Sequence, residues 1–265
     1  MGRNGVIVAT ALITGATAGI GNAFARRLAA EGHDLVLVAR DAVRLDEVGR
    51  ELRERHRVDV EVLAADLSDR GQLERVAERL RDRMRPIDIL VSNAGFGVTG
   101  PFLSRELAEE ERMIEVMVRA VLVLSRAAAP CMVARGRGAI ITVSSVAGFL
   151  PGGTYSAAKA WATAFTASLA GELSGTGVTA TALCPGFVRT EFHRRAGMDM
   201  SYLPEWAWLD ADRLVAECLA DVRRGRAISV PSLRYKLAVA VLRHTPWRCS
   251  EVLARRRAAR RTKEV

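Results

Sequence analysis

The sequence predicts an α/β fold in a single domain, built on a doubly wound parallel sheet of about seven strands flanked by helices. Two observations predict it. Short, continuously apolar segments rich in Val, Ile and Leu alternate with amphipathic helical stretches, and a glycine-rich segment joins the first apolar segment to the first helix. Continuous apolar runs are typical of strands that a parallel sheet buries on both faces. Their alternation with helices implies right-handed strand–helix–strand crossovers.

The apolar segments locate the expected strands, which cover residues 9–14, 34–39, 58–64, 87–92, 139–144 and 178–184, with a late strand near 227–230. Amphipathic helices are expected between them, for example over 21–30, 69–84 and 108–134. After residue 190 the regular pattern fails. We therefore expect a catalytic domain over 1–230, in which 191–222 forms an irregular substrate-covering insert, and a basic helical C-terminal tail over 231–265.

The composition excludes several classes of protein. A hydrophobic content of 49% is too high for a disordered chain. There is no run of about 18 apolar residues, so no transmembrane helix is predicted. The 4 cysteines are far apart and the 4 histidines form no H-E-x-x-H motif, so neither disulfides nor a metal site are expected. Together these features predict a cytoplasmic protein with reduced thiols.

The positive charge is concentrated near the C-terminal end. The chain has a net charge of +9, but residues 223–265 alone hold 13 basic and 2 acidic side chains. Three interpretations of this tail remain open: a basic amphipathic helix in peripheral contact with an anionic membrane, a subunit-contact arm, or a solvated helix. Nucleic-acid binding is not expected, because no basic face with interleaved aromatic residues accompanies the charge.

The segment T-G-A-T-A-G-I-G at 14–21 follows the first strand and opens the first helix. Glycines are needed where the backbone turns sharply and where it approaches a pyrophosphate, and the helix N-terminus offers N–H groups with a partial positive charge. This context predicts a dinucleotide site in a Rossmann-type sheet. The residues expected to contact the cofactor there are Gly15, Thr17, Ala18, Gly19, Ile20 and Gly21.

The end of the second strand predicts which dinucleotide binds. An acidic residue there would bind the ribose 2′-hydroxyl of NAD and repel a 2′-phosphate. The sequence has Ala39 and Arg40 instead, and a guanidinium group suits a phosphate, so NADP(H) is expected. The alternative is that Arg40 is only solvated and that Asp41 serves NAD(H). After the third strand, Asp66 and Leu67 are candidates for holding the adenine, and Asp66 fits a turn or a helix cap equally well.

A tyrosine and a lysine mark the candidate reaction site. In Y-S-A-A-K at 155–159, Tyr155 and Lys159 are four positions apart, so both side chains project from one face of a helix. The pKa of an unperturbed tyrosine is about 10, and a nearby ammonium group would lower it. Upstream, Ser144 and Ser145 end a buried strand, where a hydroxyl group can donate a hydrogen bond to a substrate oxygen.

Together these motifs resemble the short-chain dehydrogenase/reductase family in its single-domain form. The resemblance covers residues 9–190 and also rests on Asn93-Ala94-Gly95 after the fourth strand and on P-G-F-V-R-T at 185–190. It implies NADP(H)-dependent hydride transfer between the nicotinamide and a carbonyl or secondary alcohol. It also implies a homodimer or homotetramer packed through the helices around 108–134 and 155–173.

The resemblance further implies a role for each matching residue. Tyr155 would be the proton donor or acceptor, Lys159 would bind the nicotinamide ribose and lower the tyrosine pKa, and Ser145 would orient the carbonyl group. The other implied cofactor contacts are Asn93, Ala94 and Gly95 at the sheet centre, and Pro185, Gly186, Val188 and Thr190 beside the nicotinamide.

Two positions depart from the family pattern. Met117 stands in the long helix where the family often has an asparagine that anchors a proton-relaying water, and a thioether is at best a weak acceptor. The interval of ten positions between Ser145 and Tyr155 is shorter than is usual in the family. Both departures bear on how efficient the catalysis is.

The insert after Thr190 is rich in aromatic and methionine residues, namely Phe192, Met198, Met200, Tyr202, Leu203, Trp206, Trp208 and Leu209. A lid of this composition suits an apolar carbonyl or alcohol substrate, whereas the alternative is a satellite core whose residues only pack on each other. The leading hypothesis is an NADP(H)-dependent oxidoreductase. The alternative is a cofactor-binding regulatory or membrane-peripheral protein with weak or no turnover.

Overall fold

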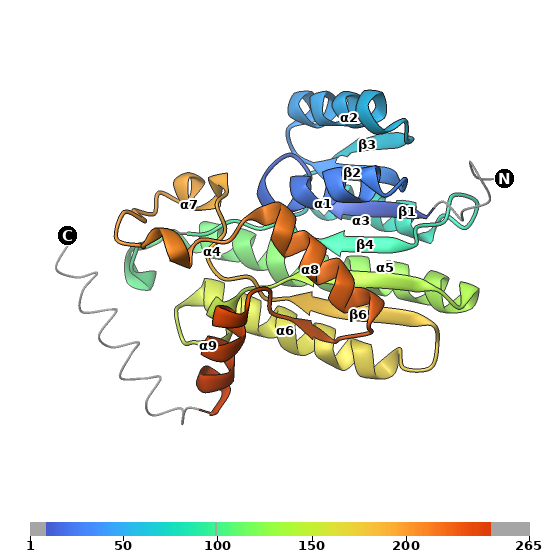
Figure 1. Ribbon diagram of the computed structural model, residues 1–265. Helices are drawn as coiled ribbons and strands as arrows, with labels where there is room; N and C mark the ends of the chain where they lie inside the picture. Colours follow the sequence, from blue (N-terminus) through green and yellow to red (C-terminus); the bar gives the residue numbers. More distant parts are fainter. Residues whose placement is uncertain (1–8, 99, 245–265) are drawn as a thin grey trace.

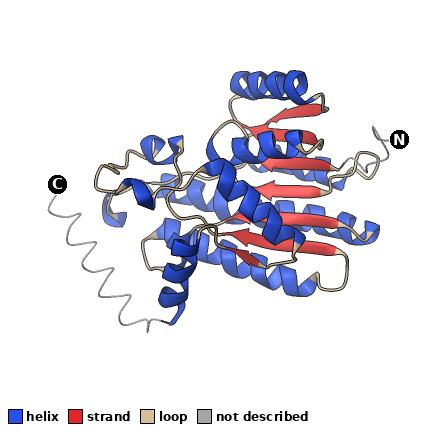
Figure 2. Ribbon diagram, in the orientation of Figure 1, coloured by secondary structure: helices blue, strands red, loops and turns tan. Residues whose placement is uncertain are grey.

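Seven parallel strands form the centre of the computed structural model, which describes residues 9–98 and 100–244 (Figures 1 and 2). The strand order is β3-β2-β1-β4-β5-β6-β7, which confirms the predicted doubly wound sheet. The strands are β1 Thr10–Thr14, β2 Asp34–Ala39, β3 Val60–Ala64, β4 Ile89–Ser92, β5 Gly138–Val143, β6 Val178–Leu183 and β7 Ile228–Ser229. Each falls within the apolar segment that predicted it, apart from β5, which begins one residue earlier.

Helices cover both faces of the sheet, because alternate strand residues point to opposite sides. In β1, Ile13 belongs to one buried cluster and Leu12 to the other. The first cluster is closed by α1 Gly19–Ala30, α2 Ala42–His56 and α8 Ala211–Arg223. The second is closed by α3 Arg70–Arg81, α5 Ala120–Arg135 and α6 Thr154–Glu172.

The long helix predicted over 108–134 is present but not uniform. It consists of α4 Leu107–Ile114, a π-helical turn η3 Glu115–Arg119 and α5. By length and composition, the run Leu107–Arg135 could cross a membrane, but half of its most apolar window is buried inside the protein. Its buried residues contact α3 and the sheet, so we interpret it as a core helix.

The segment 191–222 is more regular than the sequence predicts. It contains a short helix α7 Glu191–Arg195 and a 3-10 turn η5 Glu205–Ala207, but its last third is the regular helix α8. The expectation of an irregular insert up to residue 222 is therefore wrong. Buried residues of α8, such as Leu214 and Cys218, join the first core cluster, and the helix packs against α1. Only 191–210 lies apart from the sheet-covering layers.

The predicted helical tail begins with α9 Leu233–His244, and the tail residues 245–265 lie outside the described part of the chain. The first part of the tail is not separate from the catalytic domain. The Tyr235 hydroxyl accepts a hydrogen bond from the Phe187 N–H at 3.2 Å and donates one to the Ala207 carbonyl at 2.7 Å. These bonds fix α9 to the loop after β6 and to the segment 191–210.

All strands point toward the side of the molecule where α7 lies (Figures 1 and 2). β1 pairs with β2 on one side and β4 on the other, so the chain reverses its direction of winding between β1 and β4. Ligands of open α/β sheets bind beyond the carboxyl ends of the strands at such a reversal. The glycine-rich segment 14–21 follows β1, and the Asn93 motif, Asn93-Ala94-Gly95, follows β4.

Candidate active site

The glycine-rich loop turns from β1 into α1 with two residues in the left-handed region, Gly15 at φ 68° and Gly19 at φ 54°. Residues other than glycine rarely adopt this backbone conformation. No side chain caps α1 at its N-cap residue, Ala18, and its first turn holds no acidic residue. A helix N-terminus with these properties is suited to an anion, so the loop fits the pyrophosphate of a dinucleotide.

The Asn93 motif is bonded directly to the glycine loop. Thr14 Oγ1 accepts hydrogen bonds from the backbone N–H groups of Asn93 and Ala94 at 2.9 and 3.0 Å. Asn93 Nδ2 in turn donates to the Thr14 carbonyl at 2.9 Å. A β-carbon at Gly21 would lie 2.4 Å from the same Nδ2 atom. The two predicted cofactor motifs are therefore packed against each other, with room for glycine only.

At the end of β2, Arg40 is exposed and available to a ligand. The Asp41 carboxylate caps α2 by accepting a hydrogen bond from the Arg44 N–H at 3.0 Å. This capping role accounts for Asp41 without a role in NAD binding. After β3, Asp66 accepts hydrogen bonds from Ser68 and from Arg112. Its bonds to Ser68 are those of a turn residue, which is one of the two roles considered for Asp66. Leu67 is buried.

Tyr155, Lys159 and Ser145 come together at the carboxyl ends of β5 and β6. Tyr155 and Lys159 lie on one face of α6, with Lys159 Nζ 5.7 Å from the centroid of the tyrosine ring. The Ser145 side chain hydrogen-bonds Tyr155 and also caps the short turn η4 Val146–Phe149. Ser144 instead points inward, where its hydroxyl donates to the Lys159 carbonyl at 2.7 Å. Of the two serines, Ser145 is the one in the site.

Burial dominates the acid–base properties of this pair. It raises the pKa of Tyr155 to about 12, and the hydrogen bond from Ser145 offsets the effect only in part. Burial lowers the pKa of Lys159 to about 8, because desolvation disfavours the ammonium form. Lys159 Nζ donates to the Val143 carbonyl at 2.8 Å. In the protein without cofactor, burial therefore has the larger effect on the tyrosine pKa.

Met117 lies in the π-helical turn and is only 2% exposed. A β-carbon at Gly95 would be 3.1 Å from Met117 Sδ and 3.7 Å from Lys159 Nζ. The thioether thus packs beneath the Asn93 motif and close to the lysine. This is the position at which the family pattern has an asparagine.

The P-G-F-V-R-T motif runs along the other side of the site. The Pro185 carbonyl accepts a hydrogen bond from the Val146 N–H at 2.9 Å, and Val188 is buried and pairs with Leu209. Gly186 lies under Tyr235, whose ring would be 2.0 Å from a β-carbon there. Thr190 caps α7 and would be 3.1 Å from a β-carbon at Gly19. The motif therefore reaches from the tyrosine site to the glycine loop.

A row of aromatic rings covers Tyr155. The Phe192 ring lies 5.9 Å from the Tyr155 ring, and His193 lies 5.4 Å from Phe192 and 5.3 Å from Trp208. His193 is a residue that the sequence did not single out. Burial lowers its pKa, and its Nδ1 atom is buried without a hydrogen-bond partner among the described residues. The row forms an aromatic wall beside the phenol, with one polar imidazole ring in it.

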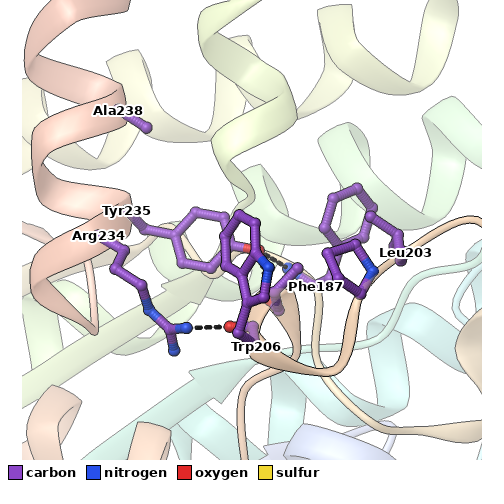
Figure 3. Close-up of a pocket in the computed structure, with 8 residues that line it drawn as sticks. Phe187, Leu203, Trp206, Arg234, Tyr235 and Ala238 are labelled. Carbon is purple, nitrogen blue, oxygen red and sulfur yellow. Dashed lines mark hydrogen bonds between the residues drawn. The ribbon is translucent and has the colours of Figure 1, made fainter.

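Beyond this row, a cavity of about 300 Å³ lies between the segment 191–210 and α9 (Figure 3). Its walls are almost entirely apolar, with the Arg234 guanidinium at one side, where it donates to the Trp206 carbonyl and stacks over the Trp206 ring. The lining residues are Phe187, Leu203, Pro204, Trp206, Ala207, Arg234, Tyr235 and Ala238. Phe187 also packs against His193, which connects this cavity with the aromatic row.

Comparison with known proteins gives consistent matches. The family model for short chain dehydrogenase matches residues 9–200. Sulfoacetaldehyde reductase 2 of Chromohalobacter salexigens is 36% identical over 80% of this chain and 85% of its own length. A short-chain dehydrogenase from Sphingobium yanoikuyae in complex with NADPH is 38% identical, with a TM-score of 0.81 over 95% of this chain and 94% of that one. The bulky-bulky ketone specific alcohol dehydrogenase from Comamonas testosteroni is 32% identical, with a TM-score of 0.78 over 98% and 96% of the two chains.

Proposed function

Because the chain belongs to the short-chain dehydrogenase family, we propose that Tyr155, Lys159 and Ser145 form the reaction site of the oxidoreductase. The enzyme transfers a hydride between NADP(H) and a carbonyl or alcohol substrate. The nicotinamide supplies or accepts the hydride when the cofactor is bound. The observation that carries the assignment is the meeting of these three side chains beside the glycine loop and the Asn93 motif.

In this assignment Tyr155 donates a proton to the carbonyl oxygen during reduction and accepts one during oxidation. Its raised pKa keeps the phenol protonated at neutral pH, which suits the reducing direction. Ser145, already hydrogen-bonded to the phenol, holds the substrate oxygen in place. Lys159 binds the ribose of the cofactor and supplies a positive charge near the phenol. Arg40 binds the 2′-phosphate, and the glycine loop binds the pyrophosphate.

We further propose that the substrate is a bulky, apolar ketone or secondary alcohol. The rings of Phe192, His193 and Trp208 present an aromatic wall from Tyr155 toward the apolar cavity beside Phe187. Apolar concave surfaces of this kind bind small molecules mainly through buried area. The Comamonas relative is described as specific for bulky-bulky ketones, which agrees with this substrate class. The sulfoacetaldehyde reductase acts on a small anionic aldehyde by its name and points to a different class.

The proposal also covers the extent of the catalytic domain, the subunit contact and the role of the basic tail. The catalytic domain extends into α9, with 191–210 providing the substrate-covering insert, and it acts in a cytoplasmic homodimer or homotetramer. The exposed apolar side chains Leu107, Ile114 and Leu122 on α4 and α5 support a subunit contact. The basic tail over 231–265 supports peripheral contact with anionic membranes, with exposed Leu233 and Leu237 on α9 as its apolar side.

A substrate panel tests the proposal. Bulky aryl and alicyclic ketones, small ketones and sulfoacetaldehyde would be assayed by nicotinamide absorbance with NADPH and with NADH, using Tyr155→Phe as the control for enzyme-dependent turnover. We expect the highest kcat/KM for bulky apolar ketones with NADPH. Preference for sulfoacetaldehyde would contradict the substrate class, and turnover that survives in Tyr155→Phe would contradict the site.

A further inference from the structure

An ion pair connects the start of α2 with the start of α7. Arg44 Nη1 donates to Glu191 Oε2 at 3.2 Å, and Arg44 Nη2 donates to Glu191 Oε1 at 3.1 Å. Two parallel bonds of this kind are the geometry in which a guanidinium binds a carboxylate most specifically. The hydrogen bond raises the pKa of Arg44 and lowers that of Glu191. Two segments that are 147 positions apart in the chain are thereby held together.

In the chain, Arg44 and Glu191 each come shortly after residues that lie beside the glycine loop. Arg44 is four positions after Arg40, and its backbone N–H is fixed to Asp41 at 3.0 Å. The loop itself is bonded to the end of β2, because the Gly15 N–H donates to the Val38 carbonyl at 2.8 Å. On the other side, Glu191 follows Thr190, which lies against Gly19. The pair therefore joins the phosphate-selecting end of β2 to the lid segment that carries Phe192.

Arg44 can exchange the Glu191 carboxylate for a phosphate group at little cost in stability. The two side chains are 37% and 32% exposed, and partly exposed ion pairs contribute little to stability. A phosphate dianion offers a guanidinium more charge and more acceptor oxygens than a carboxylate does. Glu191 would not be left without a cation, because Arg195 Nη2 lies 2.5 Å and Arg194 Nη2 3.8 Å from its carboxylate on the same short helix.

We propose that Glu191 competes with the 2′-phosphate of NADP(H) for Arg44, so that NADP(H) binding releases the start of α7 from α2. Arg44 is then a second phosphate ligand beside Arg40, and the Arg44–Glu191 pair links cofactor choice to the position of the lid. NAD(H), which carries a hydroxyl group in place of the phosphate, does not displace Glu191. The inference rests on the proposed function in taking the end of β2 as the 2′-phosphate site.

Calorimetric titration with NADP⁺ and NAD⁺ measures the competition directly. Arg44→Met should weaken NADP⁺ binding about tenfold and change NAD⁺ binding by less than about twofold. Glu191→Gln should tighten NADP⁺ binding about two- to fivefold, because the competitor is removed, and leave NAD⁺ binding unchanged. Arg50→Met is the matched control, since it removes an exposed charge from the same helix and should leave both affinities unchanged.

Tryptophan fluorescence from the lid, segment 191–210, gives a second test. Trp206 and Trp208 report on segment 191–210 through tryptophan fluorescence, so NADP⁺ should change the emission of the unmutated protein more than NAD⁺ does. In Glu191→Gln, where the charge that holds the pair together is removed, NADP⁺ should produce no larger change than NAD⁺. Circular dichroism spectra would show that each variant is folded.

Two results would overturn the inference. Weaker NADP⁺ binding in Glu191→Gln would show that the pair stays closed and helps to hold the cofactor. Equal losses of NADP⁺ and NAD⁺ affinity in Arg44→Met would show that Arg44 is only structural. Failure of the proposed site is recognised separately, by Arg40→Ala leaving the preference of the unmutated protein for NADP⁺ unchanged.

Discussion

Lys159 donates its hydrogen bond to the backbone carbonyl of Val143, at the end of β5, and not to the phenol of Tyr155. The strand end therefore fixes the ammonium group at a distance of 5.7 Å from the tyrosine ring centroid. In this place the ammonium group is buried, which lowers its pKa to about 8. The lysine is therefore positioned by the sheet.

The lowered pKa of Lys159 predicts a pH dependence of stability. Below pH 8 the ammonium form is present in both the folded and the unfolded state, so the cost of burying the charge is fully present. Between about pH 8 and the unperturbed pKa of 10.5 the folded state loses its proton first, so the unfolded state binds more protons and the free energy of unfolding rises with pH. Urea denaturation at pH 8 and pH 10 should show this rise relative to Lys159→Met. A difference between the two proteins that is independent of pH would contradict the buried ammonium.

Tyr155→Phe should preserve the fold and NADPH binding while reducing turnover by about 100-fold or more, because only the phenolic proton is lost. Circular dichroism, fluorescence titration with NADPH and a steady-state assay measure the three properties. Ser144→Ala is an instructive comparison, since that hydroxyl is bonded to the Lys159 carbonyl and lies outside the reaction site. A Tyr155→Phe enzyme that retains turnover within a few-fold would require another proton donor.

Most of the fold could be predicted because its signals are local. Most strands coincide with short segments rich in Val, Ile, Leu and Ala, although the edge strand β3 carries Glu61 and is only partly buried. The glycine loop and the Y-x-x-x-K motif are each contiguous in the chain. The regular helix α8 could not easily be separated from the irregular segment with Trp206, Trp208 and Leu209, which ends just before it. Its apolar residues Leu214, Val215 and Cys218 do have helical spacing, so the signal was present in the sequence.

Arg40→Ala should remove most of the preference for NADP(H). The exposed guanidinium is expected to bind the 2′-phosphate, and a hydrogen bond to a charged group contributes about 1.5–3 kcal/mol, which corresponds to at least a tenfold loss of NADP⁺ affinity. NAD⁺ affinity should change little. Titration of both cofactors with both proteins measures the effect, and similar affinities for NADP⁺ and NAD⁺ in the unmutated protein would contradict the selection by Arg40.

Met117→Asn should destabilise the protein by about 1–3 kcal/mol, because Met117 is 2% exposed and the amide would be buried among apolar groups. Met117→Leu, which nearly conserves volume, should cost less than about 1.5 kcal/mol. We expect the folded Met117→Asn enzyme to keep turnover equal to or above that of the unmutated enzyme. A folded variant with most of its activity lost would show that the thioether beside Lys159 has a positive role.

The rest of the site depends on contacts between distant segments, for which the sequence has no local signal. Arg44 and Glu191 are ordinary charged residues in the sequence, and only the crossing of α2 and the segment after β6 brings them together. His193 is close in the chain to Phe187 and Trp208, but the sequence pattern does not show that these three rings pack together. The motif reveals a charge near Tyr155 but not the extent of burial, which raises the pKa of this tyrosine in the protein without cofactor.

The hydroxyl group of Tyr235 has a consequence for shortening the chain. A protein that ends at residue 230 would keep every motif by which the family is recognised, since these fall within residues 9–200. It would nevertheless lose the partner of the Phe187 N–H and of the Ala207 carbonyl, together with the ring that covers Gly186. The Phe187 N–H and the Ala207 carbonyl would then be hydrogen-bonded only by water. The catalytic unit therefore ends later in the chain than its recognisable motifs do, and a deletion chosen by motif alone would remove one wall of the cavity proposed to bind the substrate.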